Sequence, residues 1–537
     1  MWFRSAGAAG MVALLFTLDV GASGWPTKGR DARRTSQSDV AGPRSAARVT
    51  VVPLAEEVAV NMPLTITDGG MVFVGTWGVV RSYGESDAAA WNKSDGALFA
   101  FDPRLRPLWT FEPDRVPYCY EYGDRATPLF CPNGGTLNGY NGTVEGVAAL
   151  DASGSRLYVG RGDGNFFALD ARTGALSWRF TTFNPEDPLD PEGGGEIIGG
   201  PLVGPDGTIY FATVAVGPHE TNAVYAVSPE GALLWRYPQE AKTLQETLFA
   251  APALSPDGKT LYVASAWGPT AEDLDVTSRG AVYAFHVGRG EGTGEQRLKW
   301  RFEPVNEAEW WKPPVWTSAL AVGSDGTIYG TGTEYTAGGG SAVLYALRDG
   351  GDRASYAWPR MVDLDRGRAR TSQGLALREV DGVTTRVYAT SGNFYTPLAA
   401  AYPPGGKLYA IHPATGVPLW DTPFDPEAHG ATGAMSGIAI DSHGVVYTAV
   451  SGAQDRGRVF AIDEDGSLRW QFETGGLIEW AHPVLGPQGT IYVADTRRCP
   501  WTFVPIESGS CNAWNITPAV YAISDPPRRR AVRSGVK

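Results

Sequence analysis

Between residues 49 and 525 the chain alternates short apolar runs with polar turns. The runs consist mainly of Val, Ile, Leu, Ala and Tyr, and the turns are rich in Gly, Pro, Asp and Asn, which is the pattern of β-strands joined by hairpins. In residues 207–214, Ile209 and Phe211 point to one side and Tyr210 to the other, and both sides are apolar. Such strands form sheets that are buried on both faces. No stretch sustains a 3.6-residue apolar period, so we expect very little helix.

The runs belong to a repeat that occurs eight times. Each copy has a first apolar run, a turn such as P-D-G or S-D-G, and a strand such as T-I-Y-V-A. A loop of variable length, a strand such as V-Y-A-I-D, a turn that often carries Gly, and a strand of the form L-x-W-x-F follow. The first aromatic residues of the copies are Phe73, Tyr158, Tyr210, Tyr262, Tyr329, Tyr388, Tyr447 and Tyr492, and the tryptophans of the first seven are Trp109, Trp178, Trp235, Trp300, Trp358, Trp420 and Trp470. Four short strands per repeat predict an all-β fold, a single eight-bladed β-propeller with four antiparallel strands in each blade.

The eighth copy lacks the strand that carries the tryptophan, because the chain runs from residue 524 into Asp525, Pro526 and Pro527. Residues 48–53 have strand composition and precede the first copy. We therefore predict that this segment supplies the outer strand of the last blade and closes the ring, which removes exposed sheet edges. A frayed N-terminal linker is the alternative interpretation.

The two ends of the chain differ in composition from the repeats. Arg4 followed by the apolar run at 6–20 and a small-residue site at 20–22 predicts a secretory signal peptide over residues 1–24, and a retained anchor or a mis-assigned start is the alternative. No other apolar segment is long enough to cross a membrane. The basic stretches at 25–48 and 526–537 are predicted to be a disordered linker and a disordered tail. These features indicate a periplasmic or secreted protein.

Four cysteines form two pairs with the same spacing. The first pair consists of Cys119 and Cys131, and the second consists of Cys499 and Cys511. An even, locally paired count in an exported chain favours two disulfide bonds. A tetrathiolate metal site is disfavoured because the chain has no C-x-x-C spacing.

The formal net charge of −13 and the absence of a basic stripe in the repeats argue against a nucleic-acid partner. The chain has no G-x-S-x-G, Walker or H-E-x-x-H motif, so hydrolase and kinase activities have no sequence support. Candidate rim residues are Trp310, Trp311, Trp316 and Trp480, which precede two inner strands and either bind an apolar ligand or sugar or pack between blades.

The pattern A-x-D-x-x-T-G-x-x-x-W is complete at residues 168–178, and residues 410–420 follow it with His412 in place of Asp. This pattern resembles the tryptophan-docking repeat of the pyrroloquinoline quinone (PQQ) propeller superfamily, and the resemblance covers nearly all of residues 49–525. The small residue of the pattern, Ala168 in the complete copy, is expected to let the tryptophan of a neighbouring blade lie flat. The superfamily includes both quinoprotein dehydrogenases and propellers without a cofactor, so the resemblance predicts a fold more firmly than a function.

The resemblance also implies a candidate cofactor site. In quinoprotein dehydrogenases a Glu and an Asn from successive blades hold Ca²⁺ against PQQ, and a nearby acidic residue acts as the base. Glu334, Asn393 and Asp425 occupy these places in order, and carboxylate and amide oxygens suit Ca²⁺. The metal would polarise the quinone carbonyl while Asp425 accepted a proton from an alcohol.

The chain departs from the enzyme pattern at several points. Gln373 stands near the place of the tryptophan beneath the quinone, Phe394 replaces a proline, and the chain lacks adjacent cysteines. We therefore interpret the sequence first as a binding or scaffolding platform that presents mouth loops to a protein or glycan of the cell envelope. The alternative is a PQQ- and Ca²⁺-dependent dehydrogenase that oxidises an alcohol or sugar.

Overall fold

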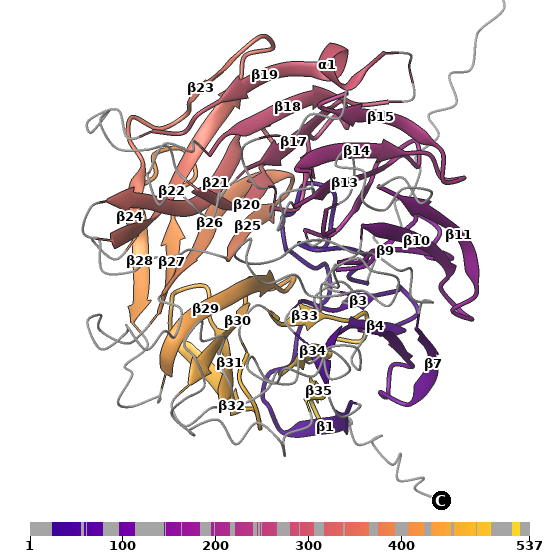
Figure 1. The fold of residues 1–537 in the computed structure, drawn as a ribbon. Helices are drawn as coiled ribbons and strands as arrows, with labels where there is room; N and C mark the ends of the chain where they lie inside the picture. The colour runs from indigo at the N-terminus through magenta and orange to yellow at the C-terminus, as the bar shows by residue number, and fades with distance from the viewer. Residues whose placement is uncertain are drawn as a thin grey trace, which may run out of the picture.

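The computed structural model describes most of residues 24–526. The longer undescribed stretches are 79–95, 113–143, 183–194, 215–220, 266–279, 306–315, 365–373, 393–405, 424–430 and 496–517, and the other gaps inside this range have at most four residues. The described strands form eight antiparallel sheets arranged as blades around a central axis (Figure 1). The prediction of an eight-bladed propeller is confirmed.

Blades 1 to 4 each contain four strands. They are β3 (Thr65–Ile66), β4 (Val72–Gly75), β6 (Leu98–Phe101) and β7 (Pro107–Phe111); β8 (Ala149–Leu150), β9 (Arg156–Gly160), β10 (Asn165–Asp170) and β11 (Leu176–Thr181); β12 (Leu202–Val203), β13 (Ile209–Thr213), β14 (Ala223–Val227) and β15 (Leu233–Tyr237); and β16 (Ala253–Leu254), β17 (Thr260–Ala264), β18 (Val282–His286) and β19 (Leu298–Phe302). A short helix, α1 (Gly294–Arg297), precedes β19 and begins with a capping box formed by Thr293 and Gln296.

Blades 5 to 7 follow the same order, and blade 5 has an outer edge made of two strands. They are β20 (Trp316–Val322), β21 (Ile328–Thr336) and β22 (Gly339–Asp349), on which β23 (Ala354–Tyr356) and β24 (Val362–Leu364) both pair; β25 (Leu375–Val380), β26 (Val383–Ser391), β27 (Lys407–Ile411) and β28 (Pro418–Pro423); and β29 (Ala431–Ile440), β30 (Val446–Gly452), β31 (Gly457–Ile462) and β32 (Leu468–Glu473). A separate two-stranded ribbon joins β2 (Val58–Ala59) to β5 (Trp77–Gly78).

Blade 8 is completed by the N-terminal part of the chain. It contains β33 (Val484–Leu485), β34 (Ile491–Ala494), β35 (Ala519–Ser524) and, as its outer strand, β1 (Arg48–Pro53). The β1–β35 pairing is continuous from Arg48↔Ser524 to Pro53↔Ala519. The predicted closure of the ring by residues 48–53 is therefore confirmed.

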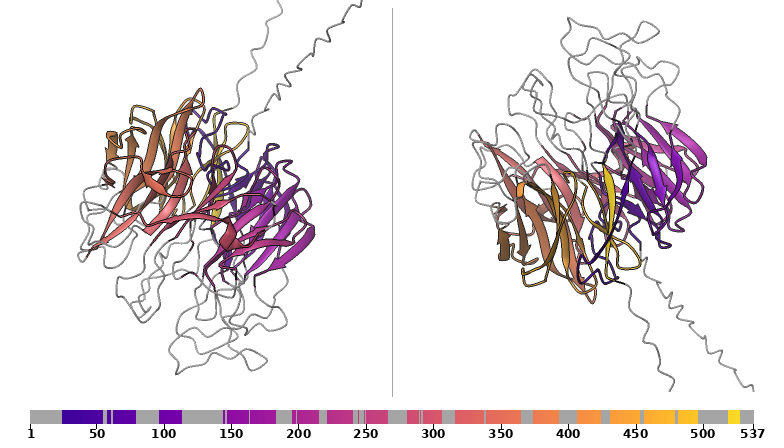
Figure 2. Two further views of the ribbon diagram at one scale, coloured as in Figure 1. Left: turned by 90° about the horizontal axis from the view of Figure 1, so that it is seen from above. Right: turned by 90° about the horizontal axis from the view of Figure 1, so that it is seen from below.

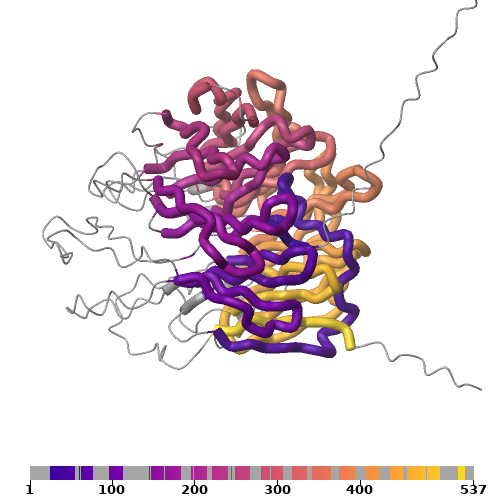
Figure 3. Tube along the Cα trace, turned by 90° about the vertical axis from the view of Figure 1, so that its right-hand side faces the viewer, coloured from indigo at the N-terminus to yellow at the C-terminus, as the bar shows by residue number. Residues whose placement is uncertain are grey.

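Residues 24–47, which we call the strap, are packed against the propeller and do not form the disordered linker that their composition suggested. The strap crosses the centre of the ring (Figure 1) and lies at one end of the propeller (Figures 2 and 3). Five inner-strand amides donate to strap carbonyls at 2.8–2.9 Å, namely Leu150 to Pro26, Leu254 to Ala32, Val322 to Arg33, Leu377 to Thr35 and Ile440 to Ser36. The expectation failed because these contacts use backbone groups, which leave no apolar period in the sequence.

The tryptophans dock each blade onto the next. Trp109 donates its indole N–H to the carbonyl oxygen of Ala171 at 3.3 Å, and its ring would lie 2.7 Å from a Cβ atom added to Gly174. Trp178, Trp358 and Trp420 donate in the same way to the carbonyl oxygens of Pro229, Pro413 and Glu464, whereas Trp300 donates to the carboxylate of Asp349. For Trp109, Trp178, Trp358 and Trp420, the residue beneath the indole is a turn glycine of the next blade, namely Gly174, Gly231, Gly416 and Gly466. Ala168, expected in that role, instead pairs across the sheet with Trp178 of its own blade.

The hydrophobic core lies between adjacent blades. Tyr210 and Ala226 of blade 3, for example, pack in one buried cluster with Leu261 and Tyr283 of blade 4. Because every sheet is covered on both faces, the strands are apolar on both faces, as the sequence predicted. Among the described residues, no helix is long and apolar enough to cross a membrane.

Candidate functional site

The two ends of the propeller are distinguished by strand direction. Each inner strand ends where it turns into the second strand, and the strap lies at this end, which we call the turn end. The opposite end, where the second strand runs toward the third, is the mouth end. In blade 5, the pair Val322 and Ile328 lies at the turn end. The pair Trp316 and Thr333 lies at the other end of the same two strands, since Trp316 precedes Val322 by six residues. Glu334 follows Thr333, so this candidate ligand lies at the mouth end.

Glu334 is 4% exposed and pairs with Ser341 in the β21–β22 ladder. Ile328, in the same strand, belongs to the cluster shared with blade 4, whereas Tyr329 belongs to the cluster shared with blade 6. Because side chains alternate along a strand, Glu334 lies on the same side as Ile328, toward blade 4. A buried carboxylate at the mouth end is therefore present, and it lies on the side of blade 5 away from blade 6.

The other residues of the predicted cofactor site lie outside the described residues. This applies to Asn393, Asp425 and Gln373. It applies equally to Cys119, Cys131, Cys499 and Cys511, and to Trp310, Trp311 and Trp480, while Trp316 is described only as part of β20. Within the described residues, no group of three or more His, Cys, Asp or Glu side chains is arranged to hold a metal ion. The Ca²⁺ and disulfide assignments remain predictions.

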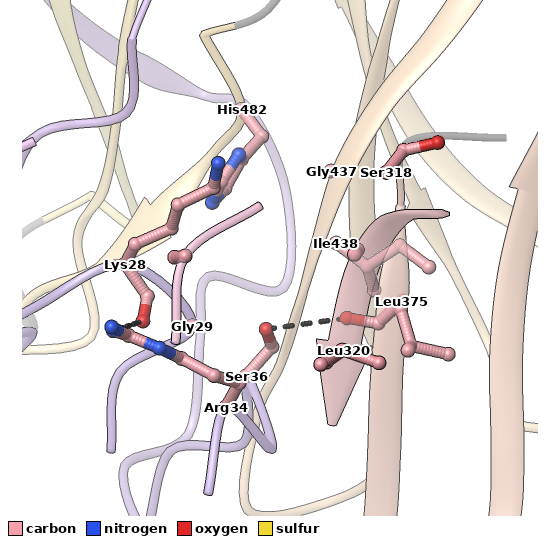
Figure 4. A pocket seen from close by; sticks show the side chains of 12 residues that line it. Lys28, Gly29, Arg34, Ser36, Ser318, Leu320, Leu375, Gly437, Ile438 and His482 are labelled. Atoms are coloured by element: carbon pink, nitrogen blue, oxygen red, sulfur yellow. Dashed lines mark hydrogen bonds between the residues drawn. The ribbon is translucent and has the colours of Figure 1, made fainter. Parts of the chain in front are cut away.

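The described part of the axial channel contains a small cavity above the strap. Figure 4 shows Lys28, Arg34 and Ser36 of the strap opposite inner-strand residues such as Leu320 and Leu375, with His482 beside the Lys28 side chain. The cavity volume is about 40 Å³. This is room for only a few water molecules, since one water needs about 10–15 Å³ on the same measure.

The cavity is electropositive. Burial lowers the pKa of the Lys28 ammonium to about 8, and the positive charge of Arg34 lowers it further. Burial also lowers the pKa of Arg34 to about 9, although Asp31 opposes the change. Both side chains therefore still carry most of their positive charge at pH 7. No Asp or Glu is among the described residues that line the cavity.

Gly437 determines how His482 lies against the channel wall. A Cβ atom added to Gly437 in β29 would stand 2.5 Å from Nδ1 of His482, which real side chains do not tolerate. His482 itself is 6% exposed and precedes β33. Glycine at position 437 therefore allows the imidazole to pack closely against the inner strand of blade 7.

Arg34 fixes the strap through hydrogen bonds to the strap itself and to residues that precede two inner strands. Its Nε donates to the carbonyl oxygen of Pro252 at 2.8 Å, and one terminal nitrogen donates to the carbonyl oxygen of Pro201 at 3.3 Å. The other terminal nitrogen donates to Thr27 Oγ1 at 2.7 Å and to the carbonyl oxygen of Lys28. The guanidinium thus joins the strap to blades 3 and 4. Sequence reasoning missed this role, and the one local signal was the large apolar Trp25 in an otherwise basic segment.

Together the fold and the channel define a PQQ-repeat β-propeller whose turn end is covered by its own N-terminal segment. The chain matches the family model described as outer membrane protein assembly factor BamB over residues 94–299 and 404–509, which together exceed half of its length. The chain therefore belongs to this family. A comparison with curated protein sequences found no match.

Three solved structures are similar to this chain. Quinohemoprotein alcohol dehydrogenase from Comamonas testosteroni aligns with a TM-score of 0.56 and 14% identity, over 95% of this chain and 82% of the other. The quinohemoprotein alcohol dehydrogenase ADHIIG from Pseudomonas putida HK5 gives 0.56 and 16% with the same coverage. BamB from Moraxella catarrhalis gives 0.48 and 15%, over 88% of this chain and 98% of the other. At these identities the first two alignments establish the propeller fold alone.

Proposed function

We propose that this protein is a binding platform of the cell envelope, which presents its mouth end to a protein or a glycan. The observation that carries the proposal is the match of residues 94–299 and 404–509 to the family model described as outer membrane protein assembly factor BamB. The described axial cavity, of about 40 Å³, lies beside the strap at the turn end and does not bear on the mouth end.

The proposal includes export of the chain. Residues 1–24 have the composition of a signal peptide, which would direct the propeller to the periplasm or outside the cell. In that oxidising compartment, disulfide bonds between Cys119 and Cys131 and between Cys499 and Cys511 would close two loop rings. Mass spectrometry of the protein purified from its native compartment, with and without reduction, tests both expectations.

Site-specific photocrosslinking tests the platform function. A photoreactive amino acid at Ser341 lies at the mouth end, beside Glu334, whereas one at Lys259 lies in the exposed turn between β16 and β17 at the turn end. In intact cells we expect a discrete crosslinked species of one envelope protein, or of a glycan, from position 341 and none from position 259. Equal crosslinking from both positions, or none from either, would overturn the proposal.

A PQQ- and Ca²⁺-dependent dehydrogenase is the second candidate. It is favoured by the buried carboxylate of Glu334 at the mouth end. Glu334 and Asn393 would hold the metal beside the quinone, which would accept electrons from the substrate when bound, and Asp425 would accept the alcohol proton. The described residues supply only one of these three groups.

Cofactor titration separates the two candidates. The platform function predicts no stoichiometric binding when PQQ and Ca²⁺ are added to the folded protein, as measured by quinone absorbance and by thermal shift. Binding that disappears in Glu334→Gln and Asn393→Ala would establish the quinoprotein site. Dye reduction with alcohols or sugars that fails in Asp425→Asn would make the protein an enzyme.

A further inference from the structure

The axial cavity is lined by two basic side chains, Lys28 and Arg34, and, among the described residues, by no carboxylate. The other lining residues are mostly small or apolar inner-strand residues such as Ala319 and Ile438, with Ser36, Ser318 and His482 as the polar exceptions. Transfer of a charged group from water to such surroundings is costly unless the charge is paired. Asp31, a carboxylate of the strap, does not line the cavity, and it accepts hydrogen bonds from the backbone N–H groups of Arg33 and Thr35.

The two cations differ in how well they are satisfied. The Arg34 guanidinium donates to three carbonyl oxygens and one hydroxyl, which spread its charge over the strap and two blades. The Lys28 ammonium donates no hydrogen bond within the described part of the chain. Figure 4 shows the Lys28 side chain extending from the strap toward His482. The donors of Lys28 are therefore available to a ligand in the cavity.

The strap holds Lys28 in place with an unusual backbone. Arg30, Arg34 and Ser36 have positive φ angles of 67°, 62° and 57°, and Gly29 has φ 68°. Left-handed conformations at non-glycine residues cost of order 1–3 kcal/mol each and persist where the surrounding structure determines them. Here the hydrogen bonds of the strap to the inner strands supply that constraint. Lys28 is thus positioned before any ligand arrives.

We propose that the axial cavity is a binding site for a small monovalent anion, with the Lys28 ammonium as its principal donor. The volume of about 40 Å³ admits a halide or a formate-sized carboxylate and excludes a dicarboxylate or a nucleotide. The anion neutralises Lys28 where burial would otherwise disfavour its charge. The site does not depend on whether the mouth end binds a partner or a cofactor.

Anion titration of the full-length protein tests the proposal. The protein is prepared in a buffer whose only anion is gluconate, which is too large for the cavity, and its melting temperature is followed while formate or bromide replaces gluconate at constant ionic strength. We expect a saturable rise of about 1–3 °C for the wild type. Lys28→Met should abolish the rise, and Lys259→Met, in an exposed turn, should retain it.

The same variants distinguish a ligand site from a structural role. In gluconate alone, Lys28→Met should melt at or above the wild-type temperature, because the variant removes a partly buried positive charge that no described carboxylate of the cavity lining pairs with. A crystal soaked in bromide should show an anomalous peak next to the Lys28 Nζ atom. A saturable rise that survives in Lys28→Met, or bromide peaks confined to the outer surface (an adventitious ion only), would overturn the proposal. If Lys28→Met does not fold, Lys28→Gln and the bromide experiment decide the outcome.

Discussion

Trp470 donates its indole N–H to the carbonyl oxygen of Pro43 at 3.0 Å, across 427 positions of sequence. In the other blades where this bond forms, the acceptor belongs to the next blade in the chain, as in the Trp420–Glu464 pair. At blade 7 the strap supplies the acceptor. The strap therefore completes the last tryptophan-docking contact, and β1 completes the last sheet.

Replacement of Trp470 tests this bond. Trp235 provides a matched control, because its buried Nε1 has no hydrogen-bond partner among the described residues. Both Trp→Phe changes remove part of the ring, but only Trp470→Phe also leaves a buried carbonyl without its donor. We expect Trp470→Phe to lower the free energy of unfolding by about 1 kcal/mol more than Trp235→Phe in urea titrations. Equal losses would show that the Pro43 contact adds no stability.

The turn glycines beneath the indoles are expected to resist substitution. Gly174 has φ 74°, and a Cβ atom there would stand 2.7 Å from the Trp109 ring, whereas Gly154 has φ 68° and open space around it. Gly154→Ala should cost about 1 kcal/mol from backbone strain alone. Gly174→Ala should cost about 1–3 kcal/mol more, because the indole must move. Thermal unfolding and the near-ultraviolet circular dichroism of the tryptophans provide the measurement, and similar losses for both variants would contradict the docking role.

Asp349 joins blades 4 and 5 and predicts a pH dependence. It accepts hydrogen bonds from Lys299 at 2.8 Å, from Trp300 at 2.8 Å and from Tyr262 at 2.9 Å. Burial raises the pKa of Asp349, but these bonds outweigh burial and hold the pKa below its ordinary value. The stability that Asp349 contributes is therefore present above its unfolded pKa, near 4, and is lost as the pH falls through its lower folded pKa.

Urea unfolding between pH 2 and pH 7 measures this contribution. The wild type should lose stability on acidification more steeply than Asp349→Asn, which cannot titrate at this position. At pH 7 the variant should be less stable by a few kcal/mol, because Lys299 is left charged and mostly buried. Parallel pH profiles for the two proteins would exclude Asp349 as a source of acid sensitivity.

Removal of the strap should loosen the centre of the ring while leaving the blades folded. In a variant that lacks residues 1–47, the amides of Leu150, Leu254, Val322, Leu377 and Ile440 lose their acceptors. Hydrogen exchange should accelerate at these positions by more than tenfold, since each bond is worth about 1 kcal/mol or more and many act together. Amides within β10, the third strand of blade 2, serve as the reference. Unchanged exchange at the five positions would show that the strap is dispensable.

The repeat could be read from sequence because each blade contains the same apolar strands and the same aromatic residues. The strand at 48–53 was also predictable, since the eighth copy lacked one strand and this segment had the right composition. The strap was not predictable in this way. It binds through backbone carbonyls and through Arg34, and neither leaves a periodic pattern in the sequence.

The two candidate sites likewise differ in how far the sequence predicted them. Glu334 was assigned by its place in the repeat, and the structure puts it at the mouth end, but strand alternation turns it toward blade 4. Lys28 lay in a basic stretch that composition assigns to solvent. Only the path of the chain through the ring brings Lys28 next to His482, because the two are separated by most of the sequence.

The pairing of β1 with β35 has a consequence for biosynthesis. Blade 8 acquires all four of its strands only after residues 519–524 have been made. A product that stops early would leave the edge of β1 and the strap without their final partners, which is a state open to aggregation and proteolysis. The seam between β1 and β35 thus couples two distant parts of the chain, so that loss of one strand exposes the edge of the other.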